Sequence, residues 1–246
     1  GEFIAERLQD YGIQQDFVQV AGETRSCLAI LTADGAQTEI LEPGPLVTAA
    51  EQQQFLAKYQ ALLPKASVVV ASGSVPQGVP QDFYAGLIRA ARAAGKKFLL
   101  DTSGELLAEG IKAQPYFIKP NKDEIQALTG RQVSSEAEVI AEVKRFLAQG
   151  IALAVVSLGA EGSIAGYQDA IYRVRVPRIT AQNPVGSGDS YVAGMAAALH
   201  RGLCIEAALK LAAACGTANA LEAESGFVQR AVVESLQAKI QAEKVA

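Results

Sequence analysis

The strongest chemical signal in the sequence is a glycine-rich segment that leads directly into an alanine-rich stretch. Residues 183–190 read Asn-Pro-Val-Gly-Ser-Gly-Asp-Ser. Glycines immediately before a helix let successive backbone N–H groups converge, and the N-terminus of the helix adds positive potential. We predict that Gly186, Ser187 and Gly188 form an anion hole for phosphate oxygens and that Asp189 accepts a proton from an attacking hydroxyl. A tight turn in which Asp189 only caps the helix would explain the same residues.

A polar segment after an expected strand is the second candidate. Residues 119–124 read Lys-Pro-Asn-Lys-Asp-Glu, so Asn121 and Glu124 have the spacing of a capping box. In isolation, helix capping is the better explanation of this pair. The functional interpretation, which is compatible with capping, has Asn121 and Glu124 facing phosphate and Mg²⁺ through water, because Mg²⁺ keeps much of its hydration shell.

Three further segments give weaker signals. Glycines 159 and 162 follow Ser157 at the end of an expected strand, where they allow close approach of the backbone to a flat or sugar-like ligand. Ser72, Gly73 and Ser74 end another expected strand. Ordinary turns explain both segments equally well. Arg25 begins a strand-like run and has the planar donor geometry that binds phosphate, although most surface arginines are only solvated charges.

Hydrophobic periodicity predicts the elements that position these residues. We expect strands at 66–71, 97–101, 116–118 and 152–157, a strand pair at 163–166 and 171–176, helices at about 80–94, 122–128 and 135–149, a short helix near 105, and three alanine-rich helices at the end. Strands that alternate with helices predict an α/β fold with a mostly parallel sheet and right-handed crossovers. Such sheets bind ligands at the carboxyl ends of their strands.

The first part of the chain has a different pattern. Residues 16–20, 26–31 and 37–41 are short strand-like runs with a turn at 33–35 and no helix between them. They predict a small antiparallel sheet, which would serve as a lid over a site, as a dimer contact, or as a β-meander without a function.

Composition narrows the function classes. The 246 residues include 22 Lys and Arg against 26 Asp and Glu, for a formal net charge of −4, with no block of like charges. Binding to nucleic acid or to an anionic membrane therefore has no electrostatic support. The three cysteines (Cys27, Cys204 and Cys215) lack metal-ligand spacing, and their odd number argues against a disulfide framework, so a reducing cytoplasm fits best. We find no basic-then-apolar signal sequence and no apolar run long enough to span a bilayer.

The order of these motifs resembles that of the PfkB, or ribokinase-like, carbohydrate kinases over essentially the whole chain. Residues 183–189 are similar to the Gly-x-Gly-Asp signature of that family, and residues 121–124 to its Asn-x-x-Glu motif. Residues 157–162 resemble its nucleotide-side glycine turn, and residues 72–74 its sugar-side loop. Within the family, the segments that look most like those of tagatose-6-phosphate kinases are 22–31, 38–42 and 179–190.

The resemblance implies one ribokinase-like kinase domain over residues 1–246, with lid strands at about 16–41. It implies ATP and Mg²⁺ as cofactors and transfer of a phosphoryl group to a ketohexose phosphate, tagatose 6-phosphate giving tagatose 1,6-bisphosphate, with a homodimer formed through the lid. Arg25, Ser72, Gly73 and Ser74 would bind the sugar phosphate. The residues that would bind ATP are Ser157, Gly159, Gly162, Asn183, Gly216 and Asn219.

Three rival functions stay open. A 1-phosphofructokinase shares nearly all of this framework. A nucleotide- or sugar-binding protein without catalysis is a second alternative, and a dimeric scaffold is a third. Members of the family begin with a strand, a sugar-binding Asp and a Gly-Gly loop before the segment that matches Gly1-Glu2-Phe3. We therefore expect the sequence to be incomplete at its amino terminus, and the chain as given not to be a competent kinase.

Overall fold

The computed structural model describes residues 1–32 and 37–245, which divide into two compact units. The first unit comprises Gly1–Lys65 and Val75–Gln81, and the second comprises Ala66–Ser74 and the chain from Asp82 onward.

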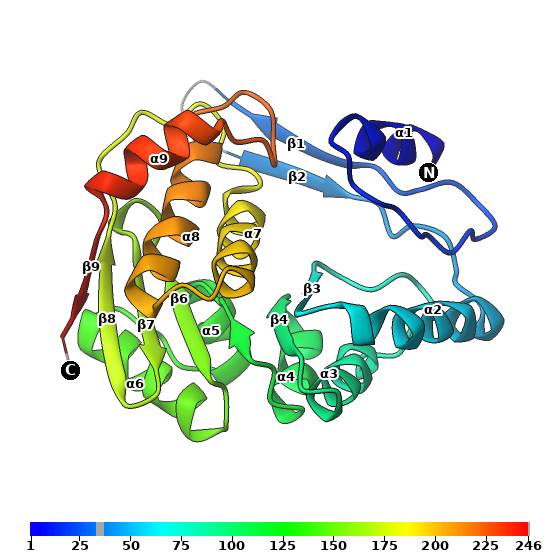
Figure 1. The fold of residues 1–246 in the computed structure, drawn as a ribbon, viewed down its shortest axis with the longest axis horizontal. Coiled ribbons are helices and arrows are strands. Elements are labelled where there is room, and N and C mark those ends of the chain that lie inside the picture. The colour runs from blue at the N-terminus through cyan, green and yellow to red at the C-terminus, as the bar shows by residue number, and fades with distance from the viewer. Residues whose placement is uncertain (33–36, 246) are drawn as a thin grey trace. The chain divides into compact units, whose positions relative to one another are not determined.

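The second unit is built on a seven-stranded sheet whose strands lie side by side in the order of the sequence (Figure 1). Its strands are β3 (Val68–Ser72), β4 (Lys97–Asp101), β5 (Phe117–Ile118), β6 (Leu153–Ser157), β7 (Ser163–Tyr167), β8 (Ala170–Arg175) and β9 (Gln241–Lys244). Neighbours from β3 to β6 pair in parallel, and neighbours from β6 to β9 pair antiparallel. Strands β3, β4, β5, β6 and β8 therefore run in one direction, which confirms the predicted mostly parallel sheet.

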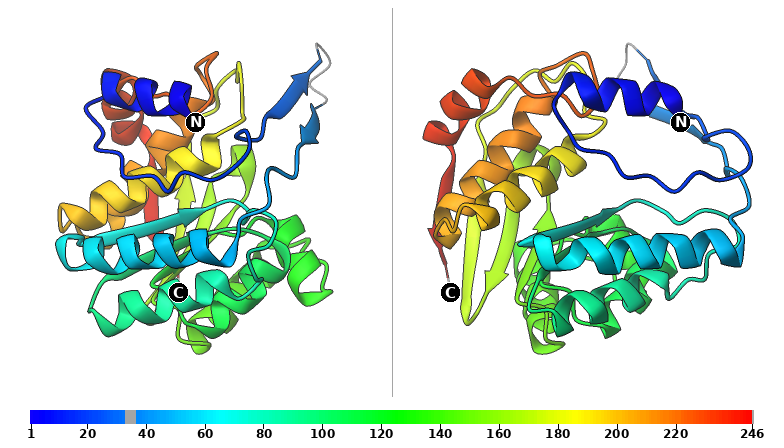
Figure 2. Two further views of the ribbon diagram at one scale, coloured as in Figure 1. Left: turned by 90° about the vertical axis from the view of Figure 1, so that its right-hand side faces the viewer. Right: turned by 45° about the vertical axis from the view of Figure 1, so that its right-hand side comes forward.

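Helices cover both faces of this sheet (Figure 2). They are α3 (Phe83–Ala93), α4 (Gly104–Lys112), α5 (Lys122–Thr129), α6 (Glu136–Ala148), α7 (Ser187–His200), α8 (Ile205–Asn219) and α9 (Arg230–Lys239). Residues 153–156 of β6 are all fully buried, as expected for a strand without polar alternation. Leu153 and Val155 pack with Met195 of α7 and Leu209 of α8. On the opposite face, Gly166, the partner of Ala154, lies against α6.

The crossovers bring several chain segments to one edge of the sheet. Helix α3 connects β3 to β4, α4 connects β4 to β5, and α5 and α6 connect β5 to β6. Because these four strands are parallel, their carboxyl ends meet at the same edge. The polar residues at the ends of these strands are therefore close to one another.

Strand β9 is a difference from the sequence-based expectation, which ended the chain with helices. The segment Gln-Ala-Glu-Lys carries no β-branched or aromatic residue, so its composition gives no strand signal. It forms a strand because it pairs with β8, from Tyr172↔Lys244 to Arg175↔Gln241, and ends the sheet on that side.

The first unit contains α1 (Glu2–Asp10), β1 (Cys27–Leu31), β2 (Gln37–Leu41), α2 (Ala49–Leu62) and a 3₁₀ turn at Leu63–Lys65. Strands β1 and β2 form the predicted small antiparallel sheet, with Leu28 opposite Ile40. The turn expected at 33–35 lies outside the described residues. A capping box between Thr48 and Glu51 begins α2, a helix that periodicity did not predict.

The strand expected at Asp16–Val20 is wrong, because these residues form no helix or strand. Their content of β-branched and aromatic residues fits a strand, but a strand also needs a partner, and among the described residues β1 and β2 pair only with each other. Instead, Lys58 of α2 binds this segment through the carboxylate of Asp16 and, at 2.7 Å, the carbonyl oxygen of Phe17. Among the described helices, none has the length and apolar character needed to cross a membrane.

Candidate active site

The predicted base, Asp189, lies in the first turn of α7 and receives a hydrogen bond from the end of β3. The Ser72 hydroxyl donates to Oδ1 of Asp189 at 2.6 Å. The helix begins after Gly186, and no side chain caps it, so Asp189 is not the helix cap that the sequence left open as an alternative. Its carboxylate is solvent-accessible and oriented by a single hydroxyl, which suits a group that must accept a proton from a substrate.

The anion hole predicted before Asp189 has the expected helix geometry. Gly186 has a φ of +82°, and a Cβ atom there would lie 2.6 Å from the Ser225 hydroxyl, so only glycine fits this turn. The N–H of Ser187 donates to the carbonyl oxygen of Pro184 at 3.2 Å. The N–H groups of the next two residues, Gly188 and Asp189, lie in the first helical turn and have no intrahelical acceptor. These two groups are the better donors for an anion.

The side chain of Asn219, at the end of α8, forms hydrogen bonds with the glycine-rich loop. Its side chain is fully buried, and its amide donates to the Val185 carbonyl at 2.8 Å and to the Ser187 hydroxyl at 3.2 Å. Its oxygen accepts from the Gly226 N–H at 2.7 Å and from the Ser190 hydroxyl at 3.2 Å. In the structure, Asn219 therefore holds the glycine-rich loop in place through buried hydrogen bonds.

Two other residues predicted on the ATP side also shape this loop. Asn183 accepts a hydrogen bond from the Val185 N–H at 3.0 Å and donates one to the Ala223 carbonyl at 3.0 Å. Gly216 of α8 lies so close to the loop that a Cβ atom would stand 2.9 Å from the Ser187 carbonyl oxygen. Direct contact of Asn183 and Gly216 with ATP stays a prediction.

An ion pair that sequence reasoning missed lies beside the anion hole. Nζ of Lys119, after β5, is 3.3 Å from Oδ1 of Asp101, at the end of β4, and both side chains are largely buried. A Cβ atom on Gly188 would lie 3.3 Å from Nζ of Lys119, so the ammonium adjoins the start of α7. Burial raises the pKa of Asp101, Lys119 lowers it in part, and the nearby Asp189 carboxylate raises it. A cation and a helix N-terminus thus face the same point, as an anion site requires.

The predicted pair Asn121 and Glu124 forms a complete capping box at the start of α5. Each backbone N–H donates to the other side chain at 2.8 Å. Burial raises the pKa of Glu124, while the N–H of Asn121 and the charge of Lys119 lower it and Asp101 raises it further. Glu124 and Asp101 are thus close enough to interact, at the same edge of the sheet.

The donor set at this edge fits a hydrated Mg²⁺ ion. Among the described residues, no group of three His, Cys, Asp or Glu side chains gathers as a metal site. Mg²⁺ needs fewer protein ligands than that, because it usually keeps several waters and is held by one or two carboxylates together with substrate phosphates. Glu124 and Asp101 are two partly buried carboxylates whose negative charges repel each other, and together they could hold such an ion.

The glycine turn after β6 lies next to the capping box. Ser157 forms a parallel bridge with Asn121, and its N–H donates to the Pro120 carbonyl at 3.0 Å. The turn that follows is the 3₁₀ segment Gly159–Glu161, and Gly162 closes it with a φ of +91°. The structure therefore brings this turn to the same edge as the other candidates.

The serine-containing loop after β3 also lies at this edge. Gly73 has a φ of +85°, and its N–H donates to the Asp101 carbonyl at 2.8 Å, while its own oxygen accepts from the Thr102 hydroxyl at 2.8 Å. Ser74 is exposed. Arg25 belongs to the first unit, where it is exposed and its guanidinium is 3.5 Å from the carbonyl oxygen of Glu42. Its predicted contact with a substrate phosphate stays a prediction.

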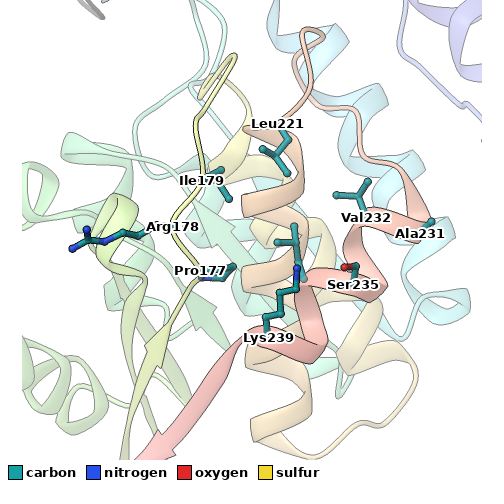
Figure 3. A pocket seen from close by; sticks show the side chains of 9 residues that line it. Pro177, Arg178, Ile179, Leu221, Ala231, Val232, Ser235 and Lys239 are labelled. Atoms are coloured by element: carbon teal, nitrogen blue, oxygen red, sulfur yellow. The ribbon is translucent and has the colours of Figure 1, made fainter.

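A cavity of about 400 Å³ lies among segments that continue from the site (Figure 3). Its lining comes from the β8–α7 connection, the segment that follows α8 and helix α9, and it includes Ile179, Leu221 and Val232. The N–H groups of Gln182 and Asn183 donate to the carbonyl of Ala220, so the walls of the cavity are tied to the glycine-rich loop. The cavity is mainly apolar and does not include Asp189.

Comparison with known proteins gives a consistent result. The model of the pfkB family carbohydrate kinases matches residues 1–230. A Staphylococcus aureus protein provisionally named a phosphofructokinase is 33% identical, with a TM-score of 0.86 over 99% of this chain and 78% of that one. Phosphofructokinase-2 from Escherichia coli, solved with potassium, is 26% identical, with a TM-score of 0.87 over 97% of this chain and 78% of that one.

A third structure, from Thermotoga maritima, is provisionally named a 1-phosphofructokinase. It is 26% identical and has a TM-score of 0.89 over 100% of this chain and 79% of that one. The agreement of the family match with these folds confirms the ribokinase-like α/β fold expected from the sequence.

Proposed function

We propose a specific reaction for this chain, which belongs to the pfkB family of carbohydrate kinases and is a sugar-phosphate kinase. The proposed reaction transfers the γ-phosphoryl group of ATP to a hydroxyl of a ketohexose phosphate, converting tagatose 6-phosphate into tagatose 1,6-bisphosphate. The observation that carries it is the Ser72–Asp189 hydrogen bond of 2.6 Å at the N-terminus of α7, beside the buried ammonium of Lys119. A base, an anion-binding helix end and a fixed cation converge there.

Each group has a role in such a transfer. Asp189 accepts the proton of the attacking hydroxyl, and Ser72 orients the carboxylate until the substrate hydroxyl takes its place. The N–H groups of Gly188 and Asp189 and the ammonium of Lys119 bind the phosphoryl oxygens. Mg²⁺, held near Glu124 and Asp101, would neutralise charge on the ATP phosphates. Positioning and charge neutralisation supply most of the catalysis in this reaction class.

The proposed reaction also assigns binding positions to its two substrates, the sugar phosphate and ATP. The exposed loop at Gly73 and Ser74 contacts the sugar, and Arg25 holds its existing phosphate group. The glycine turn at Gly159–Gly162 binds the nucleotide, and the apolar cavity beside Ile179 accepts the adenine base, since bases are flat and mainly apolar.

Fructose 1-phosphate is the second candidate substrate, because one similar structure is named a 1-phosphofructokinase. The experiment is an ATP-consumption screen over tagatose 6-phosphate, fructose 6-phosphate and fructose 1-phosphate, with ³¹P NMR to show which hydroxyl is phosphorylated. Consumption with fructose 1-phosphate alone would replace the proposed substrate. ATP binding without consumption of any of the three would instead support the rival function of a non-catalytic binding protein.

The variant Asp189→Asn tests the assignment of the base. The amide preserves the shape of the carboxylate but removes its basicity, so kcat should fall by about 10²–10⁴-fold while ATP still binds. The matched control is Asp169→Asn, in the exposed turn between β7 and β8, which should leave kcat unchanged. A kcat close to that of the wild type for Asp189→Asn would remove Asp189 from the mechanism.

The β1–β2 sheet supports a further proposal, a homodimer. Leu28, Ile30 and Ile40 share one face of this sheet by register, and each is about half exposed. Two-stranded sheets are marginally stable alone, and a second copy of the same apolar face would cover this one. Sedimentation analysis should give a dimer that Ile30→Glu dissociates and the control Leu203→Glu does not. A wild-type monomer at micromolar concentration would exclude this interface.

We also place the protein in the cytoplasm, because its cysteines are all free, two of them are exposed, and exposed thiols persist in a reducing compartment. Recovery of the enzyme in the membrane or secreted fraction of its source cells would exclude that location.

A further inference from the structure

Arg173, in the middle of β8, is a buried charged residue to which the proposed mechanism gives no role. Only 7% of its side chain is exposed. Its Nη1 donates to three carbonyl oxygens, those of Glu161 at 2.9 Å, Val174 at 2.9 Å and Ser163 at 3.2 Å. Nη1 has two hydrogens, so one of these bonds is shared between acceptors. Burying a guanidinium is costly unless its hydrogen bonds are satisfied, and here backbone oxygens satisfy them.

Two of these three carbonyl oxygens lie in the glycine turn that follows β6 or directly after it. Glu161 is the last residue of the 3₁₀ segment, and Ser163 begins β7. Within the turn, the N–H of Leu158 donates to the Gly162 carbonyl at 2.8 Å and the N–H of Gly162 donates to the Gly159 carbonyl at 3.0 Å. Gly159, Ala160 and Glu161 of the turn are exposed and Gly162 is partly buried, whereas Arg173 is buried.

A second contact fixes the turn to the same strand. A Cβ atom on Gly162 would lie 2.1 Å from the carbonyl oxygen of Val174, the residue after Arg173. On its other side, Nε of Arg173 donates to Oε2 of Glu136, the first residue of α6, at 3.2 Å. Arg173 therefore joins the turn to β8 and to the start of α6.

We propose that Arg173 is a positioning residue for the nucleotide, acting through the backbone of the turn Gly159–Gly162. The proposal rests on the assignment of this turn to the ATP side under the proposed function. Without the guanidinium, the carbonyls of Glu161 and Ser163 lose their hydrogen bonds from Arg173, and the turn loses one of the contacts that hold it against β8. ATP binding weakens, and sugar-phosphate binding at the end of β3 does not.

The test compares Arg173→Met with its matched control Arg175→Met in the full chain. Arg175 lies two residues further along β8, but its side chain is half exposed and pairs with Glu243 of β9. Isothermal titration with ATP gives the Kd without any turnover, and steady-state kinetics give KM for ATP and for the sugar phosphate separately. Arg173→Met should raise both the Kd and the KM for ATP by about tenfold and leave the sugar-phosphate KM within about twofold.

Two further variants keep the test decisive if Arg173→Met does not fold. Arg173→Lys keeps the charge but reaches fewer carbonyls, so its Kd for ATP should be intermediate. Glu136→Gln changes a half-exposed residue whose carboxylate accepts from Nε of Arg173, and it should raise the Kd for ATP by a smaller factor. The control Arg175→Met should match the wild type.

The outcomes separate this inference from the proposed function. If Arg173→Met and Arg173→Lys lower the melting temperature but leave the Kd for ATP unchanged, Arg173 is only structural and the inference fails, whatever the substrate. Equal losses for ATP and sugar phosphate also overturn it. If the Kd for ATP rises as expected while none of the sugar phosphates is phosphorylated, the inference stands and the proposed reaction fails.

Discussion

Replacing Lys119 with methionine should make the stability of this protein depend on pH through a single carboxyl group. The side chains of Lys119 and Asp101 are 8% and 17% exposed, and their charges are 3.3 Å apart. Methionine fills much of the same volume without a charge, so the variant removes the ammonium and leaves the Asp101 carboxyl buried without its cation.

The free energy of unfolding that Lys119→Met loses depends on whether Asp101 stays ionised or binds a proton. Leaving a buried charge unpaired typically costs about 3–5 kcal/mol when it stays ionised. Asp101 can avoid that cost by binding a proton, since burial already raises its pKa and loss of Lys119 removes the strongest influence that lowers it. A carboxyl whose pKa is higher in the folded than in the unfolded protein stabilises the fold most below its unfolded pKa. That stabilisation is lost as the pH rises toward the folded pKa, by up to about 1.4 kcal/mol per pH unit.

Urea unfolding of the wild type and of Lys119→Met between pH 5 and pH 8 measures this effect as a difference in the free energy of unfolding. The loss should be small at pH 5 and larger at pH 7, by up to about 2.7 kcal/mol for one proton over two pH units. The double variant Lys119→Met/Asp101→Asn should abolish the pH dependence of the difference. A loss that is the same at all pH values, or one that the second substitution leaves in place, would refute the assignment to Asp101.

Three other expectations can be measured independently. Glu124→Gln should raise the Mg²⁺ concentration needed for half-maximal activity with little change in melting temperature, because glutamine still closes the capping box. Since burial raises the pKa of Glu124, the Mg²⁺ requirement of the wild type should also grow as the pH falls, and an unaltered titration for the variant would leave capping as its only role. Arg25→Lys should raise the sugar-phosphate KM and not the KM for ATP, whereas equal losses would indicate a general folding defect. Tyr191→Phe should leave the free energy of unfolding unchanged or raise it by about 1 kcal/mol. The reason is that the buried hydroxyls of Tyr191 and Ser163 lack a well-formed hydrogen bond to any described residue. A clear decrease in the free energy of unfolding, measured by denaturant titration, would count against this.

The sequence was most informative where one element decides its own structure. The apolar run of β4 gave the bounds 97–101 correctly, and the spacing of Asn121 and Glu124 predicted the capping box that begins α5. The turn and helix around Asp189 could likewise be predicted from glycine and alanine content alone. Each of these signals depends on residues a few positions apart.

Contacts between elements were beyond the reach of the same reasoning. A carboxylate at the end of a strand is common, so Asp101 gave no signal, and only the parallel register of β4 and β5 brings it to Lys119. The hydrogen bond between Ser72 and Asp189 joins residues 117 positions apart. Strand β9 depends entirely on its partner β8, and the expected strand at 16–20 failed for lack of one.

The four hydrogen bonds of the Asn219 amide have a consequence for motion. One fully buried side chain connects the loop before α7, the first turn of that helix, the end of α8 and the backbone at Gly226. None of these segments can shift by itself without leaving a buried amide group unpaired. The hydrogen-bonded amides of the glycine-rich loop, such as those of Asn183 and Ser190, should therefore exchange together with the end of α8 as one slow unit, rather than through opening of a flexible flap. A ligand that enters here meets a surface whose shape is already set.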